Sequence, residues 1–175
     1  MLCVNHSAPL FTVSAVENGK ARTVSLKDLK GKWVVLFFYP KDFTFVCPTE
    51  VLGFHKEVEA FRKEGAVILG VSPDNVETHA AWVKELGGID YPLLSDSGCS
   101  LSRAYGVLDP KENVPLRVTF IIDPAGIIAY AVVSHMNVGR SVEETLRVLR
   151  ALKTQKLCPA DWQPGDETLD PQLKY

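Results

Sequence analysis

The sequence lacks the features that mark membrane proteins, nucleic-acid-binding proteins and disordered chains. No unbroken apolar run is longer than Trp33–Tyr39, which is far short of the roughly 18 residues that a membrane span needs. Nineteen Lys and Arg against 21 Asp and Glu give a formal charge of −2, so no basic excess would attract a nucleic acid. Hydrophobic residues make up 46% and charged residues 23% of the 175 positions, which is average for globular proteins and argues against disorder. The length suits one ordinary domain with a buried core.

Cysteine is scarce and widely spaced: it occurs at positions 3, 47, 99 and 158, with no CxxC pair. This spacing argues against a zinc ribbon and against a small disulfide scaffold. Because the four histidines are also scattered, we expect neither a metal nor a bound cofactor. The first residues, 1–9, contain neither a charged region nor a long apolar stretch, so no secretory signal is visible. We therefore expect free thiols in a reducing compartment, the cytoplasm.

Hydrophobic patterning predicts an α/β fold. Continuous apolar runs rich in β-branched and aromatic residues are typical of buried strands, and apolar residues at helical spacing predict amphipathic helices. Ser141-Val-Glu-Glu144 is a capping box that opens the last helix. The expected elements are, in chain order, strand 32–39, helix 49–64, strand 66–71, helix 75–86, a short helix 100–105, a hairpin of strands 117–122 and 127–133, and a helix from 142.

The order of these elements predicts a thioredoxin-like arrangement. Alternating strands and helices favour parallel pairing, and the late hairpin adds antiparallel strands, so we expect a central mixed β-sheet with helices on both faces. Three prolines and a glycine interrupt any periodicity after Lys156. The sequence thus predicts a domain over residues 1–155 and an extended tail over residues 156–175.

Cys47 lies between the first predicted strand and the first predicted helix. Pro48 suits the first turn of a helix, where its missing N–H has no partner to lose. A sulfur at a helix N-terminus lies in a field that favours an anion, which makes a thiol reactive. A lone cysteine is more often buried and inert, and position alone leaves both interpretations open.

The residues around Cys47 carry a more specific signal. Residues 40–47 follow the pattern P-x-x-x-T-x-x-C, and Phe43-Thr-Phe-Val-Cys-Pro-Thr-Glu50 resembles the typical two-cysteine branch of the peroxiredoxins, which includes AhpC, the peroxidase component of alkyl hydroperoxide reductase. The likeness covers nearly the whole chain. The sequence differs from the usual family pattern near its start, where it has Ala8-Pro-Leu10-Phe11 in place of the Ala-Pro-Asp-Phe that is frequent in the family. Further matching segments are Gly31-Lys-Trp-Val-Val-Leu-Phe-Phe-Tyr-Pro40, Phe120-Ile-Ile-Asp123, Val138-Gly-Arg-Ser-Val-Glu-Glu-Thr-Leu-Arg147 and Cys158-Pro-Ala-Asp-Trp162.

The resemblance implies a catalytic set of Pro40, Thr44, Cys47 and Arg117. A thiolate attacks one oxygen of an O–O bond while the other oxygen leaves with growing negative charge, so the site needs an ionised nucleophile and fixed donors. The hydroxyl of Thr44 and the guanidinium of Arg117 can supply donors, and Pro40 can limit the access of water. The resemblance also places Glu50 and Arg140 around Arg117.

Each of these residues also has an ordinary structural interpretation. Arg117 could be an exposed arginine on a strand, although the residues that follow it look buried. Thr44 could be a loop threonine or a helix cap. Glu50 could be an acid placed in the first turn because the helix dipole favours it there.

Cys158, on the predicted tail, has two interpretations. One is a stray surface thiol. The other comes from the resemblance, which implies a resolving cysteine supplied by the partner protomer of a head-to-tail homodimer, with a higher ring oligomer as the family's usual assembly. Disulfide closure needs Cα atoms within roughly 7 Å, so we expect the chain around Cys47 to unwind locally. Reduction by a dithiol protein, either thioredoxin or a flavoprotein-linked reductase, would complete the cycle.

The sequence therefore predicts a thiol-dependent peroxidase that acts on a small hydroperoxide in antioxidant defence and redox homeostasis. A redox-regulated chaperone or peroxide-signalling scaffold is the alternative, but it needs none of the four catalytic residues. A disulfide reductase is disfavoured because there is no CxxC. No family motif includes Cys3 or Cys99, so neither is assigned a role.

Overall fold

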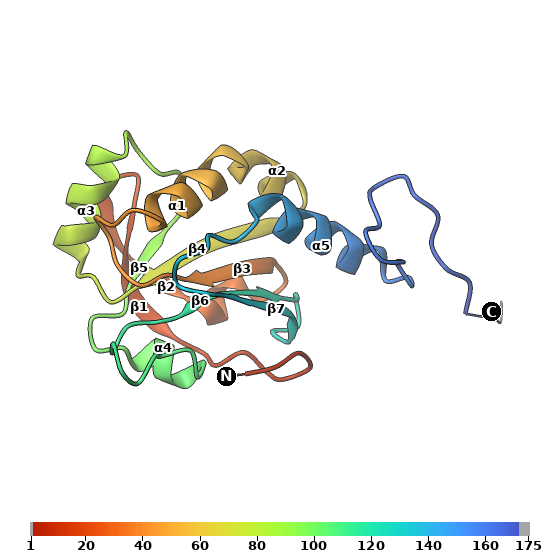
Figure 1. The fold of residues 1–175 in the computed structure, drawn as a ribbon, viewed down its shortest axis with the longest axis horizontal. Helices are drawn as coiled ribbons and strands as arrows, with labels where there is room; N and C mark the ends of the chain where they lie inside the picture. Colours follow the sequence, from red (N-terminus) through yellow and green to blue (C-terminus); the bar gives the residue numbers. More distant parts are fainter. Residues whose placement is uncertain (1, 172–175) are drawn as a thin grey trace.

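The computed structural model describes residues 2–171 and contains a seven-stranded mixed sheet (Figure 1). The strand order is β2-β1-β5-β4-β3-β6-β7, with β3–β4 and β4–β5 parallel and the other neighbours antiparallel. The elements are β1 (Thr12–Glu17), β2 (Lys20–Ser25), the 3₁₀ helix η1 (Leu26–Leu29), β3 (Trp33–Phe38), α1 (Cys47–Lys56), α2 (Val58–Lys63), β4 (Ala66–Ser72), α3 (Val76–Glu85), β5 (Leu93–Ser95), α4 (Ser100–Ala104), β6 (Arg117–Ile122), β7 (Ile128–Ser134) and α5 (Val142–Thr154).

Side chains of the central strand β3 alternate between two hydrophobic cores. Val35 and Phe37 face the core that is covered by α1, α2, α3 and α5, whereas Leu36 and Phe38 face the core under α4 and the N-terminal segment. Figure 1 shows this division, with α1, α2, α3 and α5 above the sheet and α4 below it. The predicted fold class, a mixed sheet with helices on both faces, is confirmed.

The structure corrects the predicted elements in three places. The helix expected at 49–64 is two helices, α1 and α2, which meet at Glu57, and α1 begins earlier, at Cys47. The hairpin of β1 and β2 was not predicted, nor was the three-residue strand β5. The hairpin turn consists of Asn18 and Gly19, which both have positive φ (51° and 72°), the geometry that favours Asn-Gly between paired strands.

Two predicted helix starts are confirmed in detail. The side chain of Asn75 caps α3 by accepting a hydrogen bond from the Thr78 amide, at 2.8 Å. Ser141 caps α5 in the same way by accepting from the Glu144 amide, at 3.0 Å. The carboxylate of Glu144 accepts two hydrogen bonds from Arg147 instead of one from the Ser141 amide. Only half of the capping box therefore forms.

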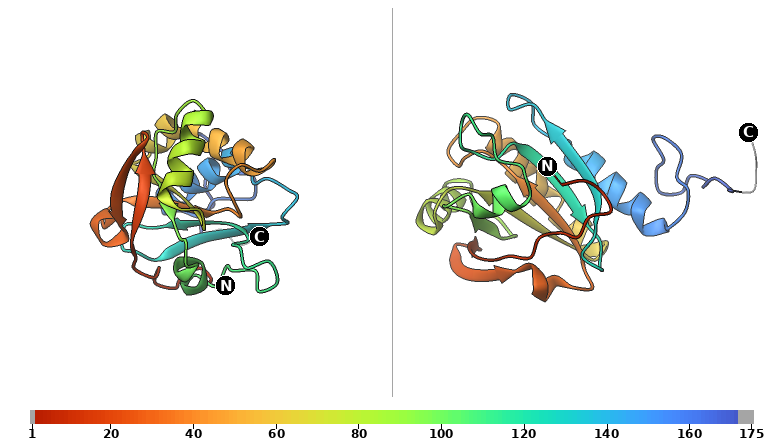
Figure 2. Two further views of the ribbon diagram at one scale, coloured as in Figure 1. Left: turned by 90° about the vertical axis from the view of Figure 1, so that its left-hand side faces the viewer. Right: turned by 90° about the horizontal axis from the view of Figure 1, so that it is seen from below.

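The chain after α5 projects beyond the body of the domain (Figure 1), as the right-hand view of Figure 2 also shows. Its described part, up to residue 171, contains no helix or strand, although Leu169 donates a backbone hydrogen bond to Leu157. Trp162 is buried, and its carbonyl accepts from Arg147 of α5. Residues 172–175 of the predicted tail lie outside the described residues. Between residues 2 and 171 no helix has the length and apolarity to cross a membrane.

Gly70 in β4 supports a prediction about the core. A Cβ there would lie 2.8 Å from the Leu93 Cδ2 and 2.8 Å from the Phe37 Cζ, two buried side chains that have little room to move. Gly70→Ala should therefore lower the free energy of unfolding by about 1–3 kcal/mol in urea titrations. Gly98→Ala is the matched control, because nothing lies within 4 Å of its Cβ and its φ is not positive. Equal stability of the two variants would contradict this account of the core.

Candidate active site

Cys47 is the first residue of α1, directly after the loop that leaves β3. Its side chain is 0% exposed. The carbonyl of Val46 accepts from the Thr49 amide at 3.0 Å and the Glu50 amide at 3.4 Å, and these bonds close the first helical turn. The predicted position of Cys47 at a helix N-terminus is thereby confirmed, with Pro48 in the first turn.

Arg117 reaches Cys47 from the neighbouring strand. β6 pairs antiparallel with β3 so that Val118 lies opposite Phe38, which places Arg117 beside the point where the chain leaves β3. The Nη1 of Arg117 donates to the Cys47 Sγ at 3.3 Å and to the Glu50 Oε2 at 2.7 Å. Its Nε donates to the Met136 carbonyl at 2.7 Å. Arg117 is only 4% exposed, so the alternative of a solvent-facing arginine is wrong.

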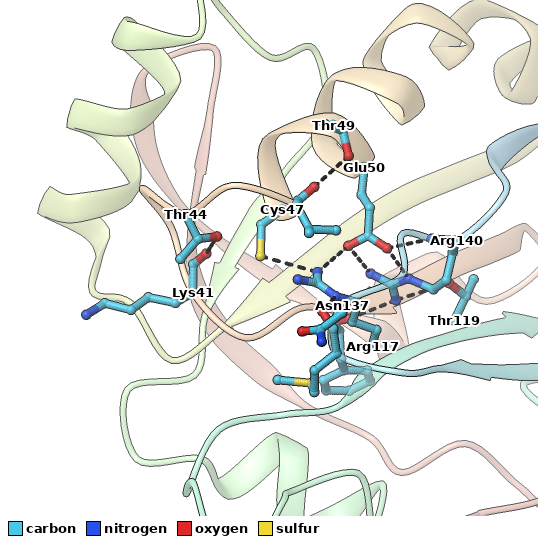
Figure 3. A network of polar contacts seen from close by, with 12 residues as sticks. Lys41, Thr44, Cys47, Thr49, Glu50, Arg117, Thr119, Asn137 and Arg140 are labelled. Atoms are coloured by element: carbon cyan, nitrogen blue, oxygen red, sulfur yellow. Dashed lines mark hydrogen bonds and ion pairs between the residues drawn. The ribbon is translucent and has the colours of Figure 1, made fainter.

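Glu50 lies between two guanidinium groups (Figure 3). It follows Cys47 by one helical turn and therefore faces the same side of α1. Arg140 donates to Glu50 from its Nε at 2.7 Å, from its Nη2 at 2.9 Å and from its amide at 2.9 Å. Burial by itself would raise the pKa of Glu50, but the hydrogen bonds and charges of Arg140 and Arg117 outweigh it and hold that pKa below its usual value.

Arg140 also ties the strands together beneath the site. Its Nη1 donates to the carbonyls of Phe38 and Val118, at 2.8 and 2.7 Å, at the ends of β3 and β6. Its guanidinium carbon lies 5.5 Å from the ring centre of Phe37, within range of a cation–π contact. Glu50 and Arg140 thus lie around Arg117, as the family resemblance implies.

Thr44 and Pro40 lie in the loop from residue 39 to residue 46. The hydroxyl of Thr44 donates to the Lys41 carbonyl at 3.1 Å, so in this conformation it is turned to its own loop (Figure 3). Pro40 is buried directly after Tyr39. A role of Thr44 as a donor to peroxide, and of Pro40 as a wall against water, stays a prediction.

Cys158 lies at the other end of α5. Its Sγ is 3.4 Å from the Thr154 Oγ1 and 3.8 Å from the Ala151 carbonyl, and the residue is half-buried. The helix starts next to Arg140 and runs for 13 residues, which at about 1.5 Å per residue puts its far end about 20 Å away from the site. Cys158 and Cys47 of one chain are both free thiols.

One buried pair near the site has no counterpart in the sequence analysis. The Nδ1 of His79 and the Oδ2 of Asp42 are 2.7 Å apart, and both side chains are 0% exposed. Asp42 precedes Cys47 by five residues, and His79 lies on α3. No sequence pattern links two residues 37 positions apart, so only the acidic residue in a loop with three aromatic residues could have drawn attention. Within residues 2–171, no group of three or more potential ligands could hold a metal.

Comparison with known proteins agrees with this geometry. The AhpC/TSA family matches residues 4–131, and the C-terminal domain of 1-Cys peroxiredoxin matches residues 151–173. Peroxiredoxin-2 of Mus musculus is 46% identical over 180 residues, which cover 97% of this chain and 91% of that protein.

Solved structures show the same likeness. The reduced 2-Cys peroxiredoxin of Plasmodium vivax superposes with a TM-score of 0.91 at 39% identity, covering 97% of this chain and 93% of the other. AhpC of Mycobacterium tuberculosis gives a TM-score of 0.85 at 38% identity, with 93% and 99% covered. With its thioredoxin-like fold and a buried cysteine held by an arginine, the chain belongs to the AhpC/TSA family and is a peroxiredoxin, a thiol peroxidase.

Proposed function

We propose that this peroxiredoxin reduces hydrogen peroxide and organic hydroperoxides through Cys47, with Cys158 of the partner subunit as the resolving thiol. The observation that carries the proposal is the 3.3 Å contact between the Arg117 Nη1 and the Cys47 Sγ. A guanidinium at this distance can hold a thiolate and, in the reaction, the oxygen that acquires negative charge. The physiological role would be antioxidant defence and redox homeostasis in the cytoplasm, where the free thiols stay reduced.

The charges around Cys47 support the thiolate as the reactive form. Arg117 and Arg140 supply two positive charges, whereas Glu50 supplies one negative charge. These three side chains are at most 7% exposed, and an uncompensated buried charge is strongly unfavourable. An ionised Cys47 would provide a second negative charge, so that the two guanidinium charges would be matched by two negative charges. A chaperone or scaffold has no need of this arrangement, which favours the enzyme over that alternative.

The proposed oxidation step uses the contacts around Cys47. The thiolate forms an S–O bond with one peroxide oxygen while the O–O bond breaks, and the departing oxygen takes up a proton to become water or an alcohol. The sulfur loses two electrons and becomes a sulfenic acid. Arg117 stabilises the charge on the departing oxygen, and Thr44 would join it once its hydroxyl turns away from Lys41. Pro40 would keep bulk water out.

The resolving step requires a second protomer and a local opening. A same-chain disulfide is disfavoured because Cys158 lies about 20 Å from the site, at the far end of α5. The thiol of Cys158 from the partner would attack the sulfenic sulfur, forming a disulfide and releasing water. Because Cys47 is buried in a helical turn, residues around it must unwind before the two Cα atoms can approach within roughly 7 Å.

A dithiol protein would then restore both thiols by thiol–disulfide exchange. Thioredoxin and a flavoprotein-linked carrier are the two candidate reductants. A head-to-tail homodimer provides two equivalent sites, and a ring of such dimers would be the higher assembly. Titrating the oxidised protein with each candidate donor identifies the reductant.

The two cysteines should give separable defects. In stopped-flow mixing with hydrogen peroxide, the reduced protein should react quickly, whereas Cys47→Ser should not react. Cys158→Ser should react once, because its sulfenic acid has no resolving thiol. On a non-reducing gel the oxidised wild type should run at the mass of a dimer, and Cys158→Ser should not. Oxidised wild type at the mass of a monomer would contradict the intersubunit disulfide.

Arg117→Gln should slow the oxidation of Cys47 by about 100-fold or more, as the loss of a fixed donor to a developing oxyanion does in other enzymes. The measurement is the second-order rate constant for peroxide under single-turnover conditions. Arg22→Gln is the control, because Arg22 pairs with Glu17 in the exposed first hairpin. A rate constant for Arg117→Gln equal to that of the control would refute the role given to Arg117.

Glu50→Gln should lower the free energy of unfolding by about 3 kcal/mol at neutral pH, because it leaves two buried guanidinium groups without their carboxylate. Since the pKa of Glu50 is depressed in the folded state, its contribution is present above about pH 4.3 and is lost as the pH falls through the folded pKa. The difference between wild type and variant should therefore shrink in acid. Urea titrations at several pH values measure it, with the partly exposed Glu64→Gln as a control of small effect.

A further inference from the structure

The buried pair of Asp42 and His79 has no part in the reaction described above, yet it holds the loop that precedes Cys47. This loop, residues 39–46, joins β3 to α1. The His79 Nδ1 and the Asp42 Oδ2 are 2.7 Å apart, at 0% exposure for both side chains. Asp42 is thereby fastened to α3, an element that contributes no residue to the site around Cys47.

Each group of the pair is fully engaged. The Tyr39 hydroxyl donates to the other oxygen of Asp42, Oδ1, at 2.9 Å. The Asp42 amide donates to the Asp74 Oδ2 at 2.8 Å, and that same oxygen accepts from the Ser72 hydroxyl at 2.7 Å. The His79 Nε2 lies 3.2 Å from the Leu94 carbonyl in β5. The loop is thus connected to the ends of β4 and β5 and to α3.

The hydrogen-bond partners of His79 fix one proton in the pair. A carbonyl oxygen only accepts, so the His79 Nε2 carries a hydrogen toward Leu94. A second proton must lie between the Nδ1 and Asp42, on the ring or on the carboxyl, because two lone pairs would repel at 2.7 Å. Burial raises the pKa of Asp42, and the contact with His79 only partly offsets this rise. His79 is therefore the neighbour that most favours the ionised form of the Asp42 carboxyl. Separating the two leaves a buried polar group unsatisfied.

The backbone next to Asp42 is strained. Phe43 has a φ of 53°, in the left-handed region that a bulky side chain rarely adopts. Its ring lies 6.2 Å from that of Trp82, which is on α3 together with His79. Strained backbone persists only where surrounding contacts hold it, and here those contacts are with α3. Releasing Asp42 therefore releases strain in the segment that leads to Cys47.

We propose that Asp42 and His79 form a latch that keeps the loop 39–46 closed and sets how often Cys47 leaves its place beside Arg117. Cys47 lies between two anchors. The ion pairs of Glu50 hold the chain after it, and the latch holds the chain before it. Opening the latch frees the loop while Glu50 stays bound. In the proposed function, on which this step rests, the open loop is the form that meets the resolving thiol, so both residues are positioning residues.

Hydrogen exchange on the reduced protein tests the latch without any peroxide. Asp42→Ala, His79→Ala and the double variant should each exchange the amides of residues 41–49, except for Pro48, which has none, at least about 10-fold faster than wild type, as expected when a buried hydrogen bond is lost and its partner is left unsatisfied. The double variant should equal the stronger single variant, because the two residues act as one unit. Additive effects, or unchanged exchange in this segment, would overturn the proposal.

Two further variants keep the test decisive. Ser102→Ala removes a buried hydrogen bond to Asp96, on the opposite face of the sheet, and should leave exchange in residues 41–49 unchanged. Equally fast exchange in this control would mean that any loss of stability opens the loop, which overturns the latch. If the alanine variants do not fold, Tyr39→Phe removes one of the donors to Asp42 and keeps the ring. It should raise the exchange rate in the same segment, and an unchanged rate would count against the latch.

Stopped-flow kinetics provide the functional readout. In the latch variants the phase that forms the disulfide should become faster, whereas the peroxide phase should not, because it needs Cys47 beside Arg117. The control Ser102→Ala should accelerate neither phase. Slowing of both phases, or equal acceleration of both, would contradict the latch. A wild type without a disulfide phase would refute the proposed function instead, and the exchange experiment would still decide on the latch.

Discussion

The carboxylate of Glu50 is the group on which the site depends. It is buried between Arg117 and Arg140, and it accepts four hydrogen bonds from them. Without it, two guanidinium groups would lie in the protein interior with no carboxylate to offset their desolvation, an arrangement that is strongly destabilising. With it, Arg117 is held in the interior with one nitrogen against the Cys47 sulfur. The contact between Arg117 and Cys47 therefore depends on the complete ion-pair cluster.

The sheet determines that this cluster can form. Antiparallel pairing of β3 with β6 brings Arg117 to the place where the chain leaves β3, and Arg140 binds carbonyls at the ends of both strands. Residues that are 67 to 102 positions apart in sequence thus meet at one edge. The helical spacing of Cys47 and Glu50 then aims thiol and carboxylate in the same direction. The same few contacts therefore hold the strand ends together and place Arg117 beside Cys47.

Local patterns predict much of this molecule, and tertiary contacts account for the rest. The apolar runs of β3 and β4 and the caps at Asn75 and Ser141 are local features, and all of them are present. The break at Glu57 leaves the apolar spacing intact, so periodicity does not reveal it. The family resemblance pointed to Cys47, Arg117, Glu50 and Arg140, which do meet. Asp42 and His79 were missed because their pairing depends on how α3 packs against a loop.

A peroxidatic cysteine faces two opposed demands in the proposed cycle, since attack on peroxide needs a fixed sulfur and disulfide formation needs a mobile one. The start of α1 suits both demands, because Pro48 contributes no amide and the amides of Thr49 and Glu50 both donate to one carbonyl, that of Val46. Unwinding there breaks few hydrogen bonds, while Glu50 remains fastened one turn later. A cysteine placed in the middle of the helix would need several more backbone bonds to break. In the proposed cycle, the location of Cys47 at the boundary between loop and helix thus allows the same residue to be held in place for the attack on peroxide and to be released for disulfide formation.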